Sequence, residues 1–344
     1  MEFLAELGLF LSKAVILAGG VLLIISAVVS LSQRSRSEEK GCLDIRHMND
    51  DIQDMKTALE EAVLDKQALK QQHKARKQEE KARRKQGTET PVKRLYVIDF
   101  HGDIRASAVA SLRQEITAIL SLARREDEVL VRLESTGGMV HAYGLASSQL
   151  ERIKRRGIPL TIAVDKAAAS GGYMMACLAD RILAAPFAVF GSIGVMAQLP
   201  NIHRLLKKHN IDVELHTAGE FKRTLTVLGK NTDKGRRKFI QDLEDVHVLF
   251  KEYVVEQRPV VDIEQVATGE IWYGKRALDR QLVDELKTSD EYICDAVNVG
   301  CQVYKVTWSQ KKSLLEKFGF SMQQALERTL FSWWDRLTAS RFFS

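Results

Sequence analysis

The sequence predicts an α/β domain with a mostly parallel sheet, preceded by a membrane-spanning helix and a long charged helix. Three observations support this fold class. Between residues 95 and 300, short apolar segments alternate with segments of helical periodicity. Near the N-terminus lies an uncharged apolar stretch, and a charged segment without proline or glycine follows it. We therefore expect an anchor over 1–36, a helical stalk and linker over 37–94, the main domain over 95–300 and an amphipathic helical tail over 301–344.

The anchor prediction rests on residues 14–31, AVILAGGVLLIISAVVSL. About 20 apolar residues suffice to cross the hydrocarbon core of a bilayer. A cleaved signal peptide is the alternative, but Glu2 and Glu6 precede the apolar stretch and no convincing small-x-small cleavage site follows it. Basic residues are denser after the stretch than before it, which favours a cytoplasmic main domain. A periplasmic main domain stays the alternative.

The stalk prediction rests on apolar residues spaced alternately three and four apart: Ile45, Met48, Ile52, Met55, Leu59 and Ala62. This spacing is typical of a coiled-coil seam. Because no proline or glycine interrupts residues 43–86, a continuous helix there would be about 66 Å long. A solvated single helix and a short coiled coil between subunits both fit, and the segment GTETP at 87–91 ends either one.

Composition excludes several classes of protein. The chain has 344 residues, and its four cysteines are scattered without a C-x-x-C pair, which argues against a disulfide scaffold and a zinc site. We expect no metal and no cofactor. The formal charge of +6 comes from residues 66–94, which hold 11 Lys and Arg against three Asp and Glu. Since no aromatic residue interrupts that basic run, we expect no nucleic-acid partner.

The main domain divides into elements by periodicity. Strands are expected at 95–100, 129–133, 158–164 and 181–184, and helices at 108–122, 142–153 and 171–178. Parallel sheets of this kind carry their chemistry at the carboxyl ends of the strands. The loops that follow residues 133, 164 and 184 are therefore the places to look for a site.

Two of these loops carry residues suited to nucleophilic catalysis. Gly137 and Gly138 form a turn that can present backbone N–H groups, although a plain tight turn has the same sequence. Ser170 lies at a strand-to-helix turn among small residues, where a nucleophile would be exposed, but serine is also a common helix cap. Lys222, after a strand-like segment at 213–216, could be the base if burial and nearby positive charge favour its neutral form. A solvated surface lysine is the other reading.

Five motifs in order carry a family resemblance: ESTGG from 134, AASGGY from 168, GSIGV from 191, GEFK from 219 and WYGKRALDRQLVDE from 272. Over residues 95–300 the chain resembles the signal peptide peptidase A and SohB family of membrane Ser-Lys peptidases, and is most similar to its short SohB-type branch. The anchor and stalk also look like that branch. The resemblance implies a Clp protease/crotonase-like fold of repeated ββα and βαβ units and a single pass through a bacterial inner membrane.

The resemblance also implies roles. Ser170 would be the nucleophile of a serine endopeptidase, Lys222 the general base, and backbone N–H groups of Gly138 or Gly137 and of Gly171 the oxyanion hole. Substrates would be membrane-associated, misfolded or signal-peptide-like polypeptides. In relatives the serine and lysine meet across an interface, so a homo-oligomer is expected. A catalytically silent scaffold and, less favoured, an acyl-CoA hydratase-like enzyme are the alternatives.

Two positions depart from the family pattern. Thr136 stands where relatives commonly have proline, which would make the loop less rigid. Gln281 stands where relatives usually have glycine, which predicts a strained or different turn.

In the tail, apolar residues at helical spacing interleave with arginines between 313 and 344. Packing on a subunit and contact with lipid headgroups both fit that pattern.

Overall fold

The structure is a computed structural model that describes residues 41–65, 67–69, 71, 74 and 92–309. Within the chain, Leu43–Trp308 forms a compact unit. The predicted anchor at 14–31 and the predicted tail helix beyond 309 lie outside the described residues. None of the helices in the described ranges combines the length and the apolar character that crossing a bilayer requires.

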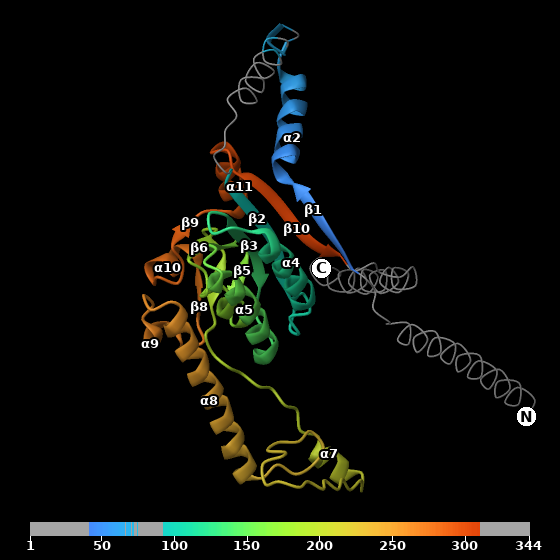
Figure 1. Ribbon diagram of the computed structural model, residues 1–344. Helices are drawn as coiled ribbons and strands as arrows, with labels where there is room; N and C mark the ends of the chain where they lie inside the picture. The colour runs from blue at the N-terminus through green and yellow to red at the C-terminus, as the bar shows by residue number, and fades with distance from the viewer. Residues whose placement is uncertain (1–40, 66, 70, 72–73, 75–91, 310–344) are drawn as a thin grey trace, which may run out of the picture. The chain divides into compact units, whose positions relative to one another are not determined.

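A mixed β-sheet forms the centre of this unit (Figure 1). Its main path runs β1-β10-β2-β3-β4-β6-β9, while β5 pairs with β3 and β7, and β8 pairs with β7. The strand bounds are β1 Cys42–His47, β2 Arg94–Gly102, β3 Glu128–Ser135, β4 Leu160–Val164, β5 Ala167–Ala169, β6 Arg181–Ala184, β7 Val189–Gly191, β8 Ile271–Tyr273, β9 Glu285–Leu286 and β10 Gln302–Ser309. The β2, β3, β4 and β6 strands run parallel, as the alternation of elements predicts, and β8 is antiparallel to β7.

Helices cover both faces of the sheet. Their bounds are α2 Met48–Val63, α4 Val109–Leu122, α5 Val140–Arg155, α6 Gly171–Ala176, α7 His203–Lys208, α8 Asp233–Gln257, α9 Ile263–Val266, α10 Gly274–Asp279 and α11 Ser289–Asn298. The larger core packs α4, α5 and α6 against one face. The smaller core on the other face packs α11 and the start of α2. Strand β4 is buried along its whole length and β3 along most of it, as expected for strands of a parallel sheet that is covered on both faces.

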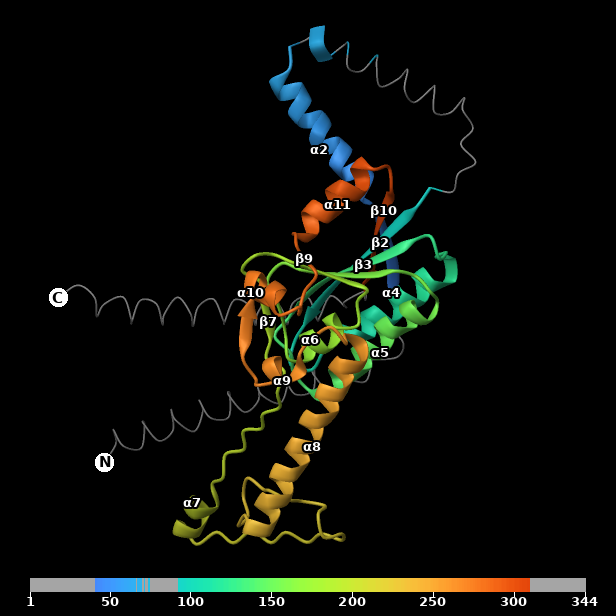
Figure 2. The ribbon, with the colours of Figure 1, turned by 90° about the vertical axis from the view of Figure 1, so that its left-hand side faces the viewer.

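Residues 192–232 form a segment, here called the arm, that runs from β7 through α7 to the start of α8. Figures 1 and 2 both show α7 at the far end of α8 from α9. Most arm residues are exposed, apolar ones included: Met196, Leu205, Ile211, Leu215 and Phe221. Helix α8 buries only Gly235, Phe250 and Val254 along its 25 residues. Within one chain, the arm and much of α8 thus have little to pack against.

The structure corrects three of the expected elements. Residues 42–47 are strand β1 and not the start of a stalk helix, and α2 ends at Val63, so the expected helix is interrupted there. Residues 302–309 form β10 next to β2, so the sheet extends past the expected border at 300. The expected strand at 213–216 is irregular loop. These short segments become strands, or fail to, because of the neighbours they pair with, and apolar spacing does not report neighbours.

Candidate active site

Ser170 occupies an unusual backbone position between β5 and α6. Its φ is 52° and its ψ is −118°, values that few residues other than glycine adopt. Its N–H donates to the carbonyl oxygen of Gly191 at 2.8 Å, which holds the strained turn in place. Such strain is common where a functional side chain must project from a sharp strand-to-helix turn.

The capping interpretation of Ser170 does not hold. A serine that caps a helix has extended backbone geometry, and its hydroxyl accepts an N–H of the first turn. Ser170 has a positive φ, and its side chain makes no capping hydrogen bond. Ser170 as a whole is half-buried, and its hydroxyl donates to no histidine among the described residues. It is therefore free to react with an external group.

The glycine turn after β3 packs directly on Ser170. Strands β3 and β5 pair so that Ser135 lies opposite Ala168, which brings the two loops together. A Cβ atom on Gly137 would lie 2.7 Å from Cβ of Ser170 and 2.8 Å from the Gly171 nitrogen. With φ at +92° as well, the Gly137 position accepts no other side chain without strain. The structure thus brings Gly137, Ser170 and Gly171 together.

Hydrogen bonds distinguish the three candidate oxyanion donors. The Gly137 N–H donates to Oγ of Ser135 at 3.0 Å and so points inward. The Met139 N–H donates to the carbonyl oxygen of Ile104 at 2.8 Å. Among the described residues, the N–H groups of Gly138 and Gly171 donate no hydrogen bond. Gly138 and Gly171 are therefore better suited than Gly137 to bind an anionic oxygen.

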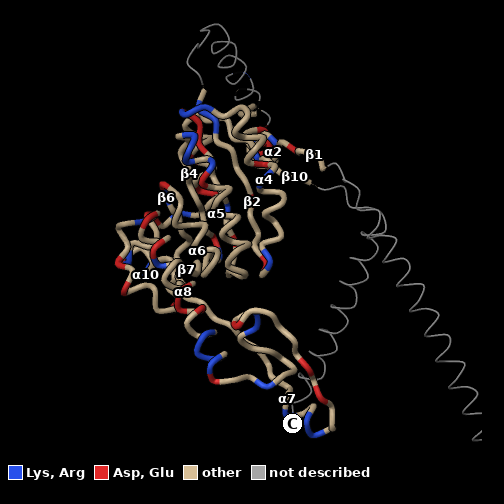
Figure 3. Tube along the Cα trace, turned by 60° about the horizontal axis from the view of Figure 1, so that its bottom comes forward, with Lys and Arg blue, Asp and Glu red and all other residues tan. Residues whose placement is uncertain are grey.

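Lys222 does not join this group within one chain. It lies in the exposed loop of the arm after Gly219, and its backbone N–H donates to the Gly219 carbonyl oxygen at 3.2 Å. The nearby Glu220 pairs with Lys234 of α8, and in the described part of the chain the Lys222 side chain itself forms no ion pair or hydrogen bond. Figure 3 shows Lys and Arg interspersed with Asp and Glu in the arm and the sheet domain.

Sequence reasoning missed the residues beneath the glycine turn. Ser135 and Tyr143 are 2% and 0% exposed, and their hydroxyl oxygens lie 2.5 Å apart. Burial raises the pKa of Tyr143, against which the hydrogen bond from Ser135 acts. The proximity of Gly102 explains its lack of a side chain, since a Cβ there would lie 2.4 Å from the Tyr143 hydroxyl. The helix expected at 142–153 contains Tyr143, but no motif or spacing in the sequence marks this contact.

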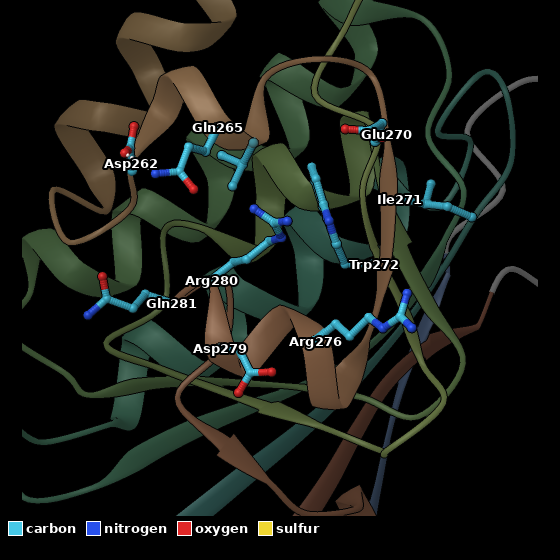
Figure 4. A pocket seen from close by; sticks show the side chains of 10 residues that line it. Asp262, Gln265, Glu270, Ile271, Trp272, Arg276, Asp279, Arg280 and Gln281 are labelled. Atoms are coloured by element: carbon cyan, nitrogen blue, oxygen red, sulfur yellow. Dashed lines mark hydrogen bonds between the residues drawn. The ribbon is translucent and has the colours of Figure 1, made fainter.

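Two further features concern the surroundings of the site. Gln281 has a φ of 58°, in the left-handed region that favours glycine, so of the two expectations for this position the strained turn is the one observed. A pocket of about 700 Å³ lies between α9, β8 and α10 (Figure 4). The guanidinium of Arg280 lies over the Trp272 ring there, and acidic and basic side chains both line the space. None of Ser170, Lys222 or the three glycines lines this pocket.

No cluster of metal-binding side chains occurs in the residues that the structure covers.

Known protein families match most of this chain. The sequence profile of the N-terminal region of peptidase family S49 matches residues 2–150, and that of peptidase family S49 matches residues 152–304. A probable protease SohB of Haemophilus influenzae is 48% identical over 334 residues, which are 94% of each chain. A probable protease SohB of Buchnera aphidicola from Schlechtendalia chinensis is 47% identical and covers 85% of this chain and 99% of its own.

Among solved structures, a mutant of the 1510-N membrane-bound stomatin-specific protease is similar at 13% identity. It covers 62% of this chain and 98% of its own, with a TM-score of 0.42. The two family profiles and the long SohB matches are independent of that structure. By these matches, the chain belongs to peptidase family S49, among the SohB proteases.

Proposed function

We propose that this protein is a membrane-anchored serine endopeptidase that uses Ser170 as nucleophile and Lys222 as general base, with the Clp protease/crotonase type of fold. The observation that carries the proposal is the position of Ser170. Its backbone is strained, and its hydroxyl has no hydrogen-bond partner among the described residues. The glycine turn of Gly137 and Gly138 packs on it, and within the same residues the N–H groups of Gly138 and Gly171 donate no hydrogen bond. A structural serine would need none of these three properties.

The chemistry follows from these positions. Oγ of Ser170 attacks the scissile carbonyl, and Lys222 takes the hydroxyl proton. The carbonyl oxygen, now negatively charged, accepts the N–H groups of Gly138 and Gly171. Lys222 then protonates the leaving amine, and the acyl-enzyme is hydrolysed by water that the same lysine activates.

Lys222 must come from a neighbouring copy in this proposal. It is exposed on the arm in a single chain, and a lysine acts as a base when its surroundings disfavour the charged form. Docking of the arm against the Ser170 region of another copy would bury both Lys222 and the exposed apolar residues of the arm. The homo-oligomer expected from the sequence thus supplies what the isolated chain lacks.

The proposed membrane anchor determines which polypeptides can reach Ser170. We propose a single-pass anchor at 14–31 in a bacterial inner membrane, with the peptidase domain cytoplasmic and a periplasmic domain as the alternative. Polypeptides held at the membrane, misfolded or resembling signal peptides, would then reach Ser170. The tail beyond residue 309 is a second candidate for lipid contact.

The first experiment labels the full-length protein in native membranes with a tagged fluorophosphonate. Wild type and Lys230→Ala should label, and Ser170→Ala and Lys222→Ala should not. Lys230 is the matched control because it is an exposed lysine of the same arm. Ser192→Ala is the control for Ser170, since Ser192 also follows a strand and has a φ of 51°. Labelling that survives in Ser170→Ala, or an unlabelled wild type that assembles normally, contradicts the proposal; the second result favours a scaffold.

Co-expression of the two inactive variants tests the shared site. If each Ser170 works with Lys222 of the next copy, random mixing at equal levels leaves about one quarter of the sites with both side chains. Labelling should then recover to about one quarter of the wild-type level. A serine and lysine from the same chain would give no recovery, because every copy lacks one of them.

A further inference from the structure

Ser135 and Tyr143 form a directed chain of hydrogen bonds beneath the glycine turn. Tyr143 donates its hydroxyl proton to the carbonyl oxygen of Asp103 at 2.8 Å. A carbonyl oxygen can only accept, so the Ser135 hydroxyl must be the donor in its 2.5 Å contact with Tyr143. Oγ of Ser135 is left to accept the Gly137 N–H at 3.0 Å. The direction of every proton in the chain is thereby fixed.

This chain holds the peptide on one side of Gly138. The Gly137 N–H is turned inward by Ser135, and the Met139 N–H on the other side is held by the Ile104 carbonyl oxygen. Gly138 lies between these two anchors, and its N–H donates no hydrogen bond to any residue that the structure describes. A Cβ on Gly138 would lie 2.2 Å from that same carbonyl oxygen. The orientation of the Gly138 N–H therefore depends on both anchors.

Tyr143 also supports the other donor. A Cβ on Gly171 would lie 2.4 Å from Cγ of Tyr143, so the ring packs against the first residue of α6. The hydroxyl of the same side chain lies beneath the turn that carries Gly138. One fully buried residue thus contacts both backbone segments that would bind the oxyanion.

We propose that Tyr143, acting through Ser135, is a positioning residue that sets the two N–H groups of the oxyanion hole. The inference rests on the proposed peptidase function and adds a specific requirement to it. The hydroxyl of Tyr143 is needed to accept from Ser135, and the ring is needed beneath Gly171. Neither group touches the substrate.

The test compares Tyr143→Phe with Tyr173→Phe in the full-length protein. Tyr173 is the matched control because it is also 0% exposed and its hydroxyl also donates to a backbone carbonyl, that of Leu282 at 3.1 Å. Both variants keep the ring and lose one buried hydroxyl. Tyr143→Phe removes the acceptor of the Ser135 proton, and Tyr173→Phe does not affect the glycine turn.

Two readouts are measured. The first is the kinetics of fluorophosphonate inactivation, from which the binding constant of the probe and the maximal rate of inactivation are obtained. In Tyr143→Phe the maximal rate should fall about tenfold, because a small misplacement of the N–H groups slows the reaction. The binding constant should stay within about twofold of the wild-type value. The second is amide hydrogen exchange of residues 136–139, measured by mass spectrometry. Exchange there should be faster in Tyr143→Phe and unchanged in Tyr173→Phe, whatever the activity.

The outcomes separate the two proposals. Wild type that does not label refutes the proposed function, while the exchange data still decide the role of Tyr143. Exchange and maximal rate equal to wild type in Tyr143→Phe would overturn the positioning role. Equal losses in both variants would also overturn it, because they would indicate a general loss of stability.

Discussion

Glu115 should make the stability of the protein depend on pH. This glutamate of α4 is 4% exposed, and its carboxylate accepts the N–H of Trp308 at 2.7 Å near the end of β10. Burial raises its pKa from 4.5 to about 7; the hydrogen bond from Trp308 acts in the other direction, and the charge of Asp99 adds slightly to the rise. The perturbation is Glu115→Gln, which keeps an acceptor for Trp308 and removes the charge.

The magnitude follows from the two pKa values. The folded protein holds this proton up to about pH 7, whereas the unfolded chain releases it near 4.5. Between those values the folded state binds more protons, so its stability falls as the pH rises. At about 1.36 kcal/mol per pKa unit, the ionised carboxylate costs about 3 kcal/mol above pH 7. Glu115→Gln should therefore be more stable than wild type by up to about 3 kcal/mol at pH 8 and by less than about 1 kcal/mol at pH 5.

Urea unfolding of the full-length protein in detergent, followed by tryptophan fluorescence, measures both differences. Glu126→Gln is the control, because Glu126 is exposed. A stability gain that is the same at pH 5 and pH 8 would refute the reasoning. So would a destabilised variant at pH 8, since that would mean that the carboxylate charge stabilises the fold.

Three other predictions concern separate parts of the chain. Gly171→Ala should abolish fluorophosphonate labelling, because its Cβ would lie 2.4 Å from the Tyr143 ring; a normally folded variant that labels like wild type would contradict this. Arg258→Met should lower the free energy of unfolding by about 2–4 kcal/mol in urea titrations, because the buried guanidinium donates to both oxygens of Asp284; a loss under 1 kcal/mol would count against it. Cys177 is buried, and burial raises its pKa to about 12, so maleimide should modify it only after denaturation; modification of the native protein, detected by mass spectrometry, would be the contrary result.

The central strands and helices could be predicted because their sequences are strongly periodic or continuously apolar. Strands β2, β3, β4 and β6 and helices α4 and α5 fall within a few residues of the expected ranges. Strand β1 and the final strand β10 could not be found in this way. Each is stabilised by a neighbour distant in the sequence, as Gln302 beside Arg94 illustrates.

The candidate site, too, could be predicted from the sequence only in part. Small residues around Ser170 and the paired glycines identified the two loops, since only small residues suit such turns. The sequence did not indicate which N–H groups are free, because that depends on the hydrogen bond from Gly137 to Ser135. The pairing of Lys222 with Ser170 across copies stays a prediction.

The sequence by itself determined the order of the elements, the family and the candidate nucleophile, because periodicity, small-residue turns and motif order are local properties of the chain. Only the tertiary structure decided that Ser170 has a strained backbone and does not cap its helix. It also decided that Tyr143 lies beneath both loops and that Lys222 is exposed on the arm. These facts depend on strand pairing and burial, which join residues far apart in the sequence.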